Sequence, residues 1–156
     1  MSWFRKRAEP DPAPGGGDAA SAASPSPTGA DEVPAETIGT STLPPEERAS
    51  IEASLARLEA AGVDLSDPRS LSAATDAGQV EREAAVAQDL AVALGEYLVR
   101  TAGYRWVLVS DSFGVDRGVE NRRGTRTVVP RDLIAARWMR GETGWLPGVL
   151  GHLSTL

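Results

Sequence analysis

Residues 90–130 read LAVALGEYLVRTAGYRWVLVSDSFGVDRGVENRRGTRTVVP and join a helical pattern directly to three short β-type runs. Apolar residues in the first part recur at the spacing of one helix face, and Gly103 is typical of a helix end. The runs 104–110, 115–121 and 125–129 follow and are rich in Val and aromatic residues, which favours strands. We expect the other ordered parts of the chain to pack around this unit.

Two similar turns separate the three β-type runs. Residues 111–114 (DSFG) and 121–124 (NRRG) each begin with Asp or Asn and end with Gly, as a type I turn followed by a left-handed residue requires. Connections this short join antiparallel neighbours. The pattern therefore predicts a three-stranded antiparallel meander.

The helix that ends at Gly103 is predicted to begin at Asp76, because Gln79 follows three residues later at the spacing of a capping box. One apolar stripe then continues at helical spacing through Val80, Ala84, Ala87, Leu90, Ala91, Leu94 and Leu98. Gly95 costs about 1 kcal/mol relative to Ala inside a helix. We therefore expect Gly95 to contact a bulky side chain, such as a tryptophan.

Shorter helices are predicted on both sides of this unit. Pro45 and Gly62 delimit a first helix over residues 45–61, whereas residues 63–78 fit either a short helix or a turn. Pro130 begins a further helix that ends at Gly141, and a last amphipathic piece covers residues 149–153. The fold class is thus α+β: a three-stranded antiparallel meander packed with a long helix and shorter N- and C-terminal helices.

The chain of 156 residues divides into a tail and one small domain. Residues 1–42 are rich in Pro, Gly, Ala, Ser and acidic residues, a composition that cannot bury enough apolar area to order itself. We expect a disordered tail there and a single α+β domain over residues 43–156. Trp3-Phe4-Arg5-Lys6-Arg7 has no apolar segment behind it, which excludes a secretory signal and disfavours all but weak membrane contact.

The residue types that are missing exclude several chemistries. The sequence has no Cys and a single His, His152. It therefore lacks the residues needed for disulfides, thiolate catalysis or a multi-histidine metal site. No stretch is long and apolar enough for a membrane-spanning helix. We expect a cytoplasmic, non-catalytic protein with no cofactor and no metal.

The second half of the chain combines a helix with a Leu-Gly motif, a strand that carries a Trp, an acidic turn that ends in Gly, and a strand that ends at Pro before a helix. The residues of these motifs are Leu94-Gly95-Glu96-Tyr97-Leu98, Gly103-Tyr104-Arg105-Trp106-Val107, Asp111, Gly114, Val129-Pro130, Arg137-Trp138 and Gly141-Glu142-Thr143-Gly144-Trp145-Leu146-Pro147. Through them, about residues 80–153 resemble the bacterial domain of unknown function 3806 family. The resemblance implies a small α+β domain, sometimes appended to others, and implies no activity.

Charge is distributed unevenly along the chain. The net charge is −3 for residues 1–40, −7 for residues 41–96 and +4 for residues 97–156, which together give the overall −6. Arg122, Arg123 and Arg126 cluster at the second turn. Guanidinium groups suit a phosphate or nucleic-acid contact, although the pI of about 4.8 disfavours nucleic acid. An acidic protein partner, or a merely solvated turn, fits the same residues.

Two hypotheses of function remain. The preferred one is a non-catalytic protein-interaction domain that binds a protein partner through the open sheet face of Val107 and Val109 and through Arg137, Trp138 and Trp145, because Trp and Arg often anchor interfaces. Of the tryptophans, Trp145 is expected to be the most exposed. The alternative is a small ligand-binding or hydrolase-like domain with a cleft near Trp106, Asp111 and Asp116.

Overall fold

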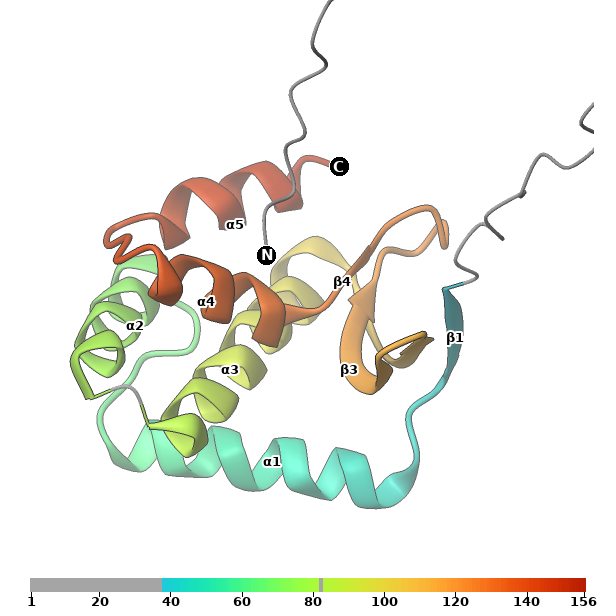
Figure 1. The fold of residues 1–156 in the computed structure, drawn as a ribbon, viewed down its shortest axis with the longest axis horizontal. Helices are drawn as coiled ribbons and strands as arrows, with labels where there is room; N and C mark the ends of the chain where they lie inside the picture. Colours follow the sequence, from blue (N-terminus) through green and yellow to red (C-terminus); the bar gives the residue numbers. More distant parts are fainter. Residues whose placement is uncertain (1–37, 82) are drawn as a thin grey trace, which may run out of the picture. The chain divides into compact units, whose positions relative to one another are not determined.

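The computed structural model of the protein describes residues 38–81 and 83–156, which lie in one compact unit, Pro34–Leu156. Predictions for residues 1–37, including Trp3-Phe4-Arg5-Lys6-Arg7, concern residues outside this part. The elements follow in the order β1 (Gly39–Thr42), α1 (Pro45–Ala60), α2 (Pro68–Glu81), α3 (Ala84–Ala102), β2 (Arg105–Asp111), β3 (Gly114–Glu120), β4 (Thr127–Val128), α4 (Pro130–Met139) and α5 (Leu146–Ser154) (Figure 1). The predicted α+β class is confirmed.

The antiparallel sheet has four strands in the order β1-β2-β3-β4. The predicted meander is confirmed by the pairing of β2 with β3, in which Trp106 lies opposite Val119 and Leu108 opposite Arg117. β1 pairs with the free edge of β2 and lies in the last part of the segment that we predicted as tail. Its sequence GTST is exposed throughout, so it is held by backbone pairing and carries no apolar pattern that could have predicted it.

The long predicted helix is two helices. α2 ends at Glu81, Glu83 has extended backbone angles, and α3 begins at Ala84. The prediction that Asp76 caps the helix is wrong, because Asp76 lies inside α2 and its carboxylate accepts a hydrogen bond from the backbone N–H of Gly144 at 3.1 Å. The prediction of a buried Val80 is also wrong, since Val80 is 84% exposed at the end of α2.

The break follows from close packing between helices. A Cβ atom added at Gly78 would lie 2.9 Å from side-chain atoms of both Leu90 and Val86, so α2 approaches α3 as closely as only a glycine permits. The chain must reverse between the two helices to make this contact. Leu71, the one strong apolar residue expected in this region, is 1% exposed and anchors α2 in the core.

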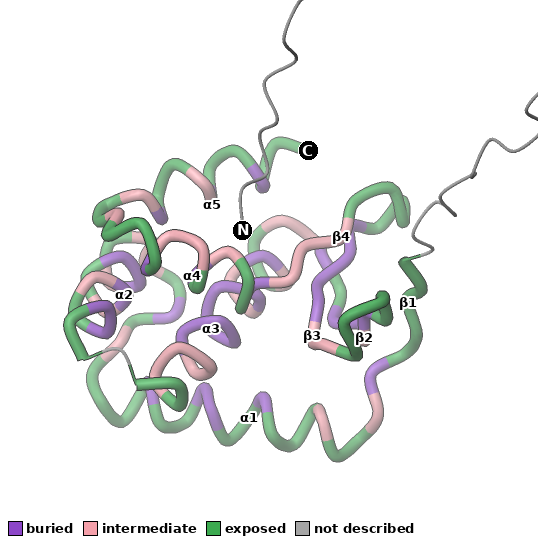
Figure 2. The backbone as a smooth tube through the Cα atoms, viewed as in Figure 1, coloured by how far each residue is buried: buried purple, intermediate pink, exposed green. Residues whose placement is uncertain are grey.

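The core is organised around α3. Residues 90–95 of this helix are all buried, as the tube in Figure 2 shows for the centre of the molecule. α1, α2, α4 and α5 pack around α3, and the sheet covers its C-terminal part (Figure 1). Tyr104, which follows α3, donates a hydrogen bond from its hydroxyl to the carbonyl oxygen of Leu153 at 3.1 Å and so ties the sheet to α5.

Candidate functional site

A cleft of about 340 Å³ lies between α1, α3, the β2–β3 hairpin and the first turn of α4, and we name it the hairpin cleft. Its lining residues come from all of these elements: Glu47, Gln88, Ala91, Val92, Trp106, Leu108, Val115, Asp116, Arg117, Pro130 and Arg131. The structure thus brings together two residues of the predicted cleft, Trp106 and Asp116. Asp111 does not line it.

Trp106 is positioned in this cleft by two contacts with α3. A Cβ atom at position 95 would lie 2.2 Å from Cη2 of Trp106, so the predicted contact of Gly95 with a tryptophan is confirmed. The indole N–H of Trp106 donates a hydrogen bond to Oε2 of Glu96 at 3.0 Å. The ring is therefore fixed in position and orientation at the bottom of the cleft.

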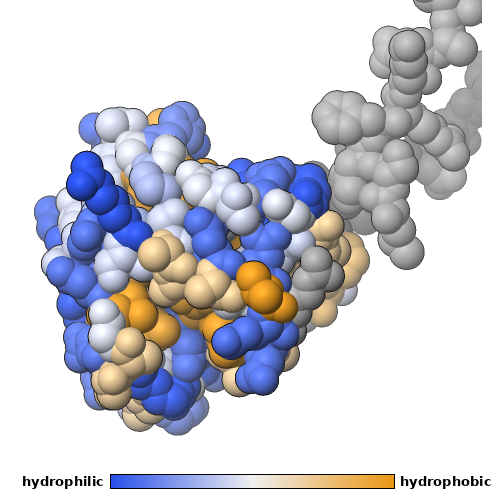
Figure 3. Space-filling model, turned by 90° about the vertical axis from the view of Figure 1, so that its left-hand side faces the viewer, coloured by the Kyte–Doolittle hydropathy of each residue, from blue (hydrophilic) through white to orange (hydrophobic). Residues whose placement is uncertain are grey.

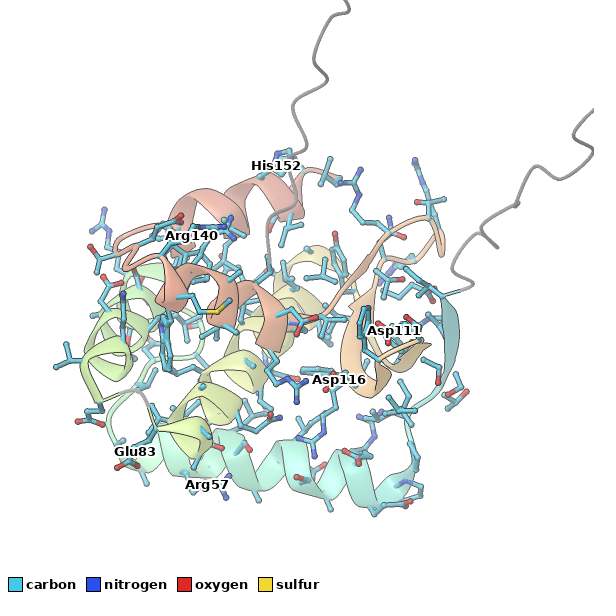
Figure 4. The ribbon with its side chains drawn as sticks, viewed as in Figure 1. Arg57, Glu83, Asp111, Asp116, Arg140 and His152 are labelled. Atoms are coloured by element: carbon cyan, nitrogen blue, oxygen red, sulfur yellow. The ribbon has the colours of Figure 1, made fainter. Side chains whose placement is uncertain are left out.

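Two ion pairs connect the elements around the hairpin cleft. Arg117 of β3 binds the carboxylate of Glu47 in α1, and its Nη2 also donates to the Ser50 hydroxyl at 2.9 Å. Asp116 of β3 pairs with Nη2 of Arg131 in α4 at 2.7 Å. Figure 4 shows Asp116 at the side of the hairpin that faces this space. The cleft therefore presents two cationic and two anionic groups around an apolar floor.

Asp111 has a local role. Its Oδ1 accepts hydrogen bonds from the backbone N–H groups of Phe113 at 2.7 Å and Gly114 at 3.1 Å. These are the bonds expected of the first residue of a turn. The only histidine, His152, lies on α5 and lines a different cavity, so the structure does not assemble Asp111, Asp116 and His152 in one place (Figure 4).

A second, larger hollow runs between β4, α4 and α5 and has a volume of about 700 Å³; we name it the α4–α5 groove. Its walls are mostly apolar and are formed by Thr127, Val128, Val129, Asp132, Leu133, Arg137, Gly148, Val149, His152 and Leu153. Burial raises the pKa of the Asp132 carboxyl above its usual value, and the negative charge of Asp116 raises it further. Sequence reasoning missed this groove, because its walls come from three elements that meet only in the folded chain.

The predicted contact residues Arg137, Trp138 and Trp145 lie on or next to α4, which forms one wall of the α4–α5 groove. Trp138 is 8% exposed and belongs to the core, whereas Trp145 is half-buried under Arg137, whose Cζ lies 5.1 Å from the centre of the Trp145 ring. Arg137 also approaches Oε2 of Glu142 at 3.4 Å. Of the predicted contact residues, Arg137 and Trp145 are therefore partly accessible and Trp138 is not.

The predicted open sheet face is closed. Val107 and Val109 are each 4% exposed. Strand β1 pairs alongside them, and the side chain of Val109 occupies the space over Gly118, where a Cβ atom would lie 2.4 Å from Cγ2 of Val109. The prediction that this face is open is wrong, because the unforeseen fourth strand and Gly118 allow the hairpin to bury its own valines.

The arginine turn, which consists of Arg122, Arg123 and Arg126, is exposed. Within residues 38–81 and 83–156 none of the three guanidinium groups forms an ion pair, whereas Arg100, Arg105, Arg117, Arg131, Arg137 and Arg140 all do. The predicted turn over residues 121–124 is present, since the N–H of Gly124 donates to the carbonyl oxygen of Asn121 at 2.9 Å. The Oδ1 of Asn121 also accepts from the N–H of Thr125 at 3.0 Å. The last of these unpaired cations, Arg126, immediately precedes the first residue of the α4–α5 groove.

Apolar groups also gather on the side of the molecule where α2 lies. Figure 3 shows them toward the centre and lower part of that face, with hydrophilic groups around them. Exposed apolar side chains elsewhere include Phe113 and Val115 at the hairpin tip.

No helix in the described part of the chain is long and apolar enough to cross a membrane.

The fold is that of a small α+β domain whose described residues form these two hollows. The chain belongs to the family described as Domain of unknown function (DUF3806), whose match covers residues 67–147. The matched segment includes α2, α3, the hairpin and α4. Of these, α3, the hairpin and α4 line the hairpin cleft together with Glu47 of α1, which lies outside the match. No curated protein and no solved structure matches the chain.

Proposed function

We propose that this protein is a non-catalytic interaction domain that binds a segment of a protein partner. The apolar side chains of the partner lie in the α4–α5 groove, and its acidic residues contact the arginine turn. One observation carries the proposal: an apolar groove of about 700 Å³ begins at Thr127, directly after Arg126 of the arginine turn, whose three exposed guanidinium groups form no ion pair with a described residue. Apolar grooves of this kind receive short segments of partner proteins, and arginine is enriched among residues that anchor interfaces.

The charges of the groove indicate how such a segment would lie. Asp132 is the acidic side chain of the groove wall, and burial together with the negative charge of Asp116 raises its pKa. Acidic residues of the partner are therefore expected at the arginine turn and not at the first turn of α4. Val149, which is half-buried on α5, would contact the apolar part of the segment.

Selection of peptides displayed on phage by the full-length protein tests this proposal. We expect enrichment of sequences that combine Asp or Glu with large apolar residues. Replacement of Arg122, Arg123 and Arg126 by Ala should remove the preference for acidic residues, and Val149→Asp should abolish selection. Matched controls are Arg48→Ala with Arg69→Ala, which changes two exposed arginines elsewhere, and Val80→Asp, which places a charge outside the groove.

Three outcomes would contradict the proposal. The first is enrichment of basic peptides, and the second is equal selection of the same peptides by the Val149→Asp variant. The third is the absence of any enriched peptide together with binding of single-stranded RNA that is lost in the triple arginine variant, which would assign the arginine turn to nucleic acid. The proposal also places the domain in the cytoplasm. Disulfides are rare in this reducing compartment, and the chain, which has no Cys, needs none. Cell fractionation checks this part.

A further inference from the structure

We propose that the hairpin cleft is a binding site for a small zwitterion with an apolar body, of the size and chemistry of a free aliphatic α-amino acid. The site is separate from the α4–α5 groove, with which it shares no lining residue. It therefore adds a second binding function to the interaction domain.

The volume and floor of the cleft suit an aliphatic group. About 340 Å³ lies at the small end of the range for ligand pockets, roughly 300–1,000 Å³, which fits a compact molecule and leaves no room for a dinucleotide. The floor consists of the fixed indole of Trp106 with Leu108, Val92, Ala91 and Pro130. Because Trp106 is held by Gly95 and Glu96, the floor is formed before any ligand arrives.

The polar groups of the cleft carry both signs of charge. Glu47 and Asp116 supply carboxylates, and Arg117 and Arg131 supply guanidinium groups. A ligand with a single charge would meet as much repulsion as attraction there. A zwitterion can direct its ammonium group to a carboxylate and its own carboxylate to a guanidinium group, which is the geometry that arginine favours.

The existing ion pairs do not exclude a ligand. The side chains of Asp116 and Arg131 are 36% and 52% exposed, and those of Glu47 and Arg117 are 33% and 20% exposed. The more exposed of the two pairs, Asp116–Arg131, is expected to contribute little to stability. The ion pair between Asp116 and Arg131 can therefore break, so that each side chain pairs with a charged group of the ligand, at a small cost in free energy.

Gln88 gives the cleft an uncommitted hydrogen-bonding group. Its side chain is half-buried on α3, lines the cleft and forms no hydrogen bond with a described residue. An amide supplies two donors and one acceptor oxygen, so Gln88 can bind either end of a zwitterion. Ala91 and Val92, on the same helix, place this amide above an apolar wall.

NMR titration of the ¹⁵N-labelled full-length protein tests the proposal with three probes. L-leucine carries both charges, L-leucinamide lacks the carboxylate, and 4-methylpentanoate lacks the ammonium group. We expect saturable shifts of the backbone amides of Gln88, Val92, Asp116 and Arg131 with L-leucine, and binding of the other two that is weaker by about tenfold or more. A zwitterion with no apolar body, glycine, should also bind less tightly.

Three variants make the test specific. Asp116→Asn and Arg131→Gln each remove one charge from the rim and should weaken L-leucine binding by about tenfold, while their spectra remain those of the folded domain. Glu142→Gln breaks the exposed Arg140–Glu142 ion pair outside the cleft and should leave binding unchanged. The proposal is overturned if no probe gives saturable shifts, if 4-methylpentanoate binds as tightly as L-leucine, or if all three variants bind alike.

Discussion

Single residues determine how closely α3 and the sheet approach each other. Trp106 fills the space that a side chain at position 95 would occupy, and its N–H binds the neighbouring Glu96. The low helix propensity of Gly95 is thus offset by the close packing of a large aromatic ring against it. The same principle operates at Gly118, over which Val109 lies in the sheet.

Gly95→Ala should destabilise the domain. Ala is favoured over Gly within a helix by about 1 kcal/mol, but the added methyl group would collide with Trp106, and overpacking of this kind costs about 1–3 kcal/mol. Urea denaturation followed by circular dichroism should show a lower free energy of unfolding. Gly151→Ala at an exposed position of α5, where nothing lies within 4 Å of the new Cβ atom, is the control and should be neutral or stabilising.

Asp111→Ala should weaken the hairpin because two backbone N–H groups lose their acceptor. We expect a loss of about 1 kcal/mol in the free energy of unfolding. The same denaturation measurement on Asp116→Asn should show a smaller loss, since Asp116 forms an exposed ion pair. Equal losses for the two variants would contradict the assignment of Asp111 to the turn.

Elements are joined to one another by polar contacts as well as by the core. Arg57 of α1 donates two hydrogen bonds to Asp89 of α3, from Nε at 2.9 Å and from Nη2 at 2.6 Å. These bonds lower the pKa of the Asp89 carboxyl below its usual value. These bonds help to fix the position of α1 relative to α3, although α2 separates the two helices in the sequence.

Asp89→Asn should reveal this contact through the pH dependence of stability. A carboxyl whose pKa is lower in the folded protein stabilises the fold above its unfolded pKa, about 3.9 for Asp, and loses that contribution as the pH falls through the folded value. The wild-type protein should therefore melt a few degrees higher than the variant at pH 7, and the difference should narrow below about pH 4. Calorimetry from about pH 2.5 to 7 checks this, with Glu52→Gln as an exposed control on α1.

For the molecule as a whole, β1 and Leu43 show that the domain extends to residues before α1. β1 pairs along the full length of its four residues with β2, and Leu43, which follows it, is 7% exposed in the core. Removal of this segment would expose both the edge of the sheet and an apolar contact. The domain therefore has to include residues that lie before its first helix.

Two truncations locate this boundary. A chain that begins at residue 38 should keep the melting temperature of the full-length protein, because residues 1–37 have a composition that buries little apolar area. A chain that begins at residue 44 lacks β1 and Leu43 and should lose about 2 kcal/mol or more. Thermal denaturation compares the two, and a lower melting temperature for the chain that begins at residue 38 would contradict the expected boundary.

The sequence by itself determined the local features of this protein. Gly103, Asp111, Asn121 and Pro130 mark the end of α3, the two turns and the start of α4, because caps, turns and proline act on their own neighbours in the chain. The contact of Gly95 with a tryptophan was also predictable, since a glycine inside a helix is costly unless something packs against it. The α+β class followed from these signals.

Only the tertiary structure decided how these pieces meet. The break after α2 depends on Gly78 against Leu90 and Val86, and the fourth strand depends on backbone pairing with β2. The α4–α5 groove and the complete rim of the hairpin cleft, including Glu47 and Arg131, are formed by residues that are distant in sequence. Contacts of this kind depend on which distant elements pack against each other. Apolar periodicity marks the buried face of each element, but it does not show which other element that face will contact.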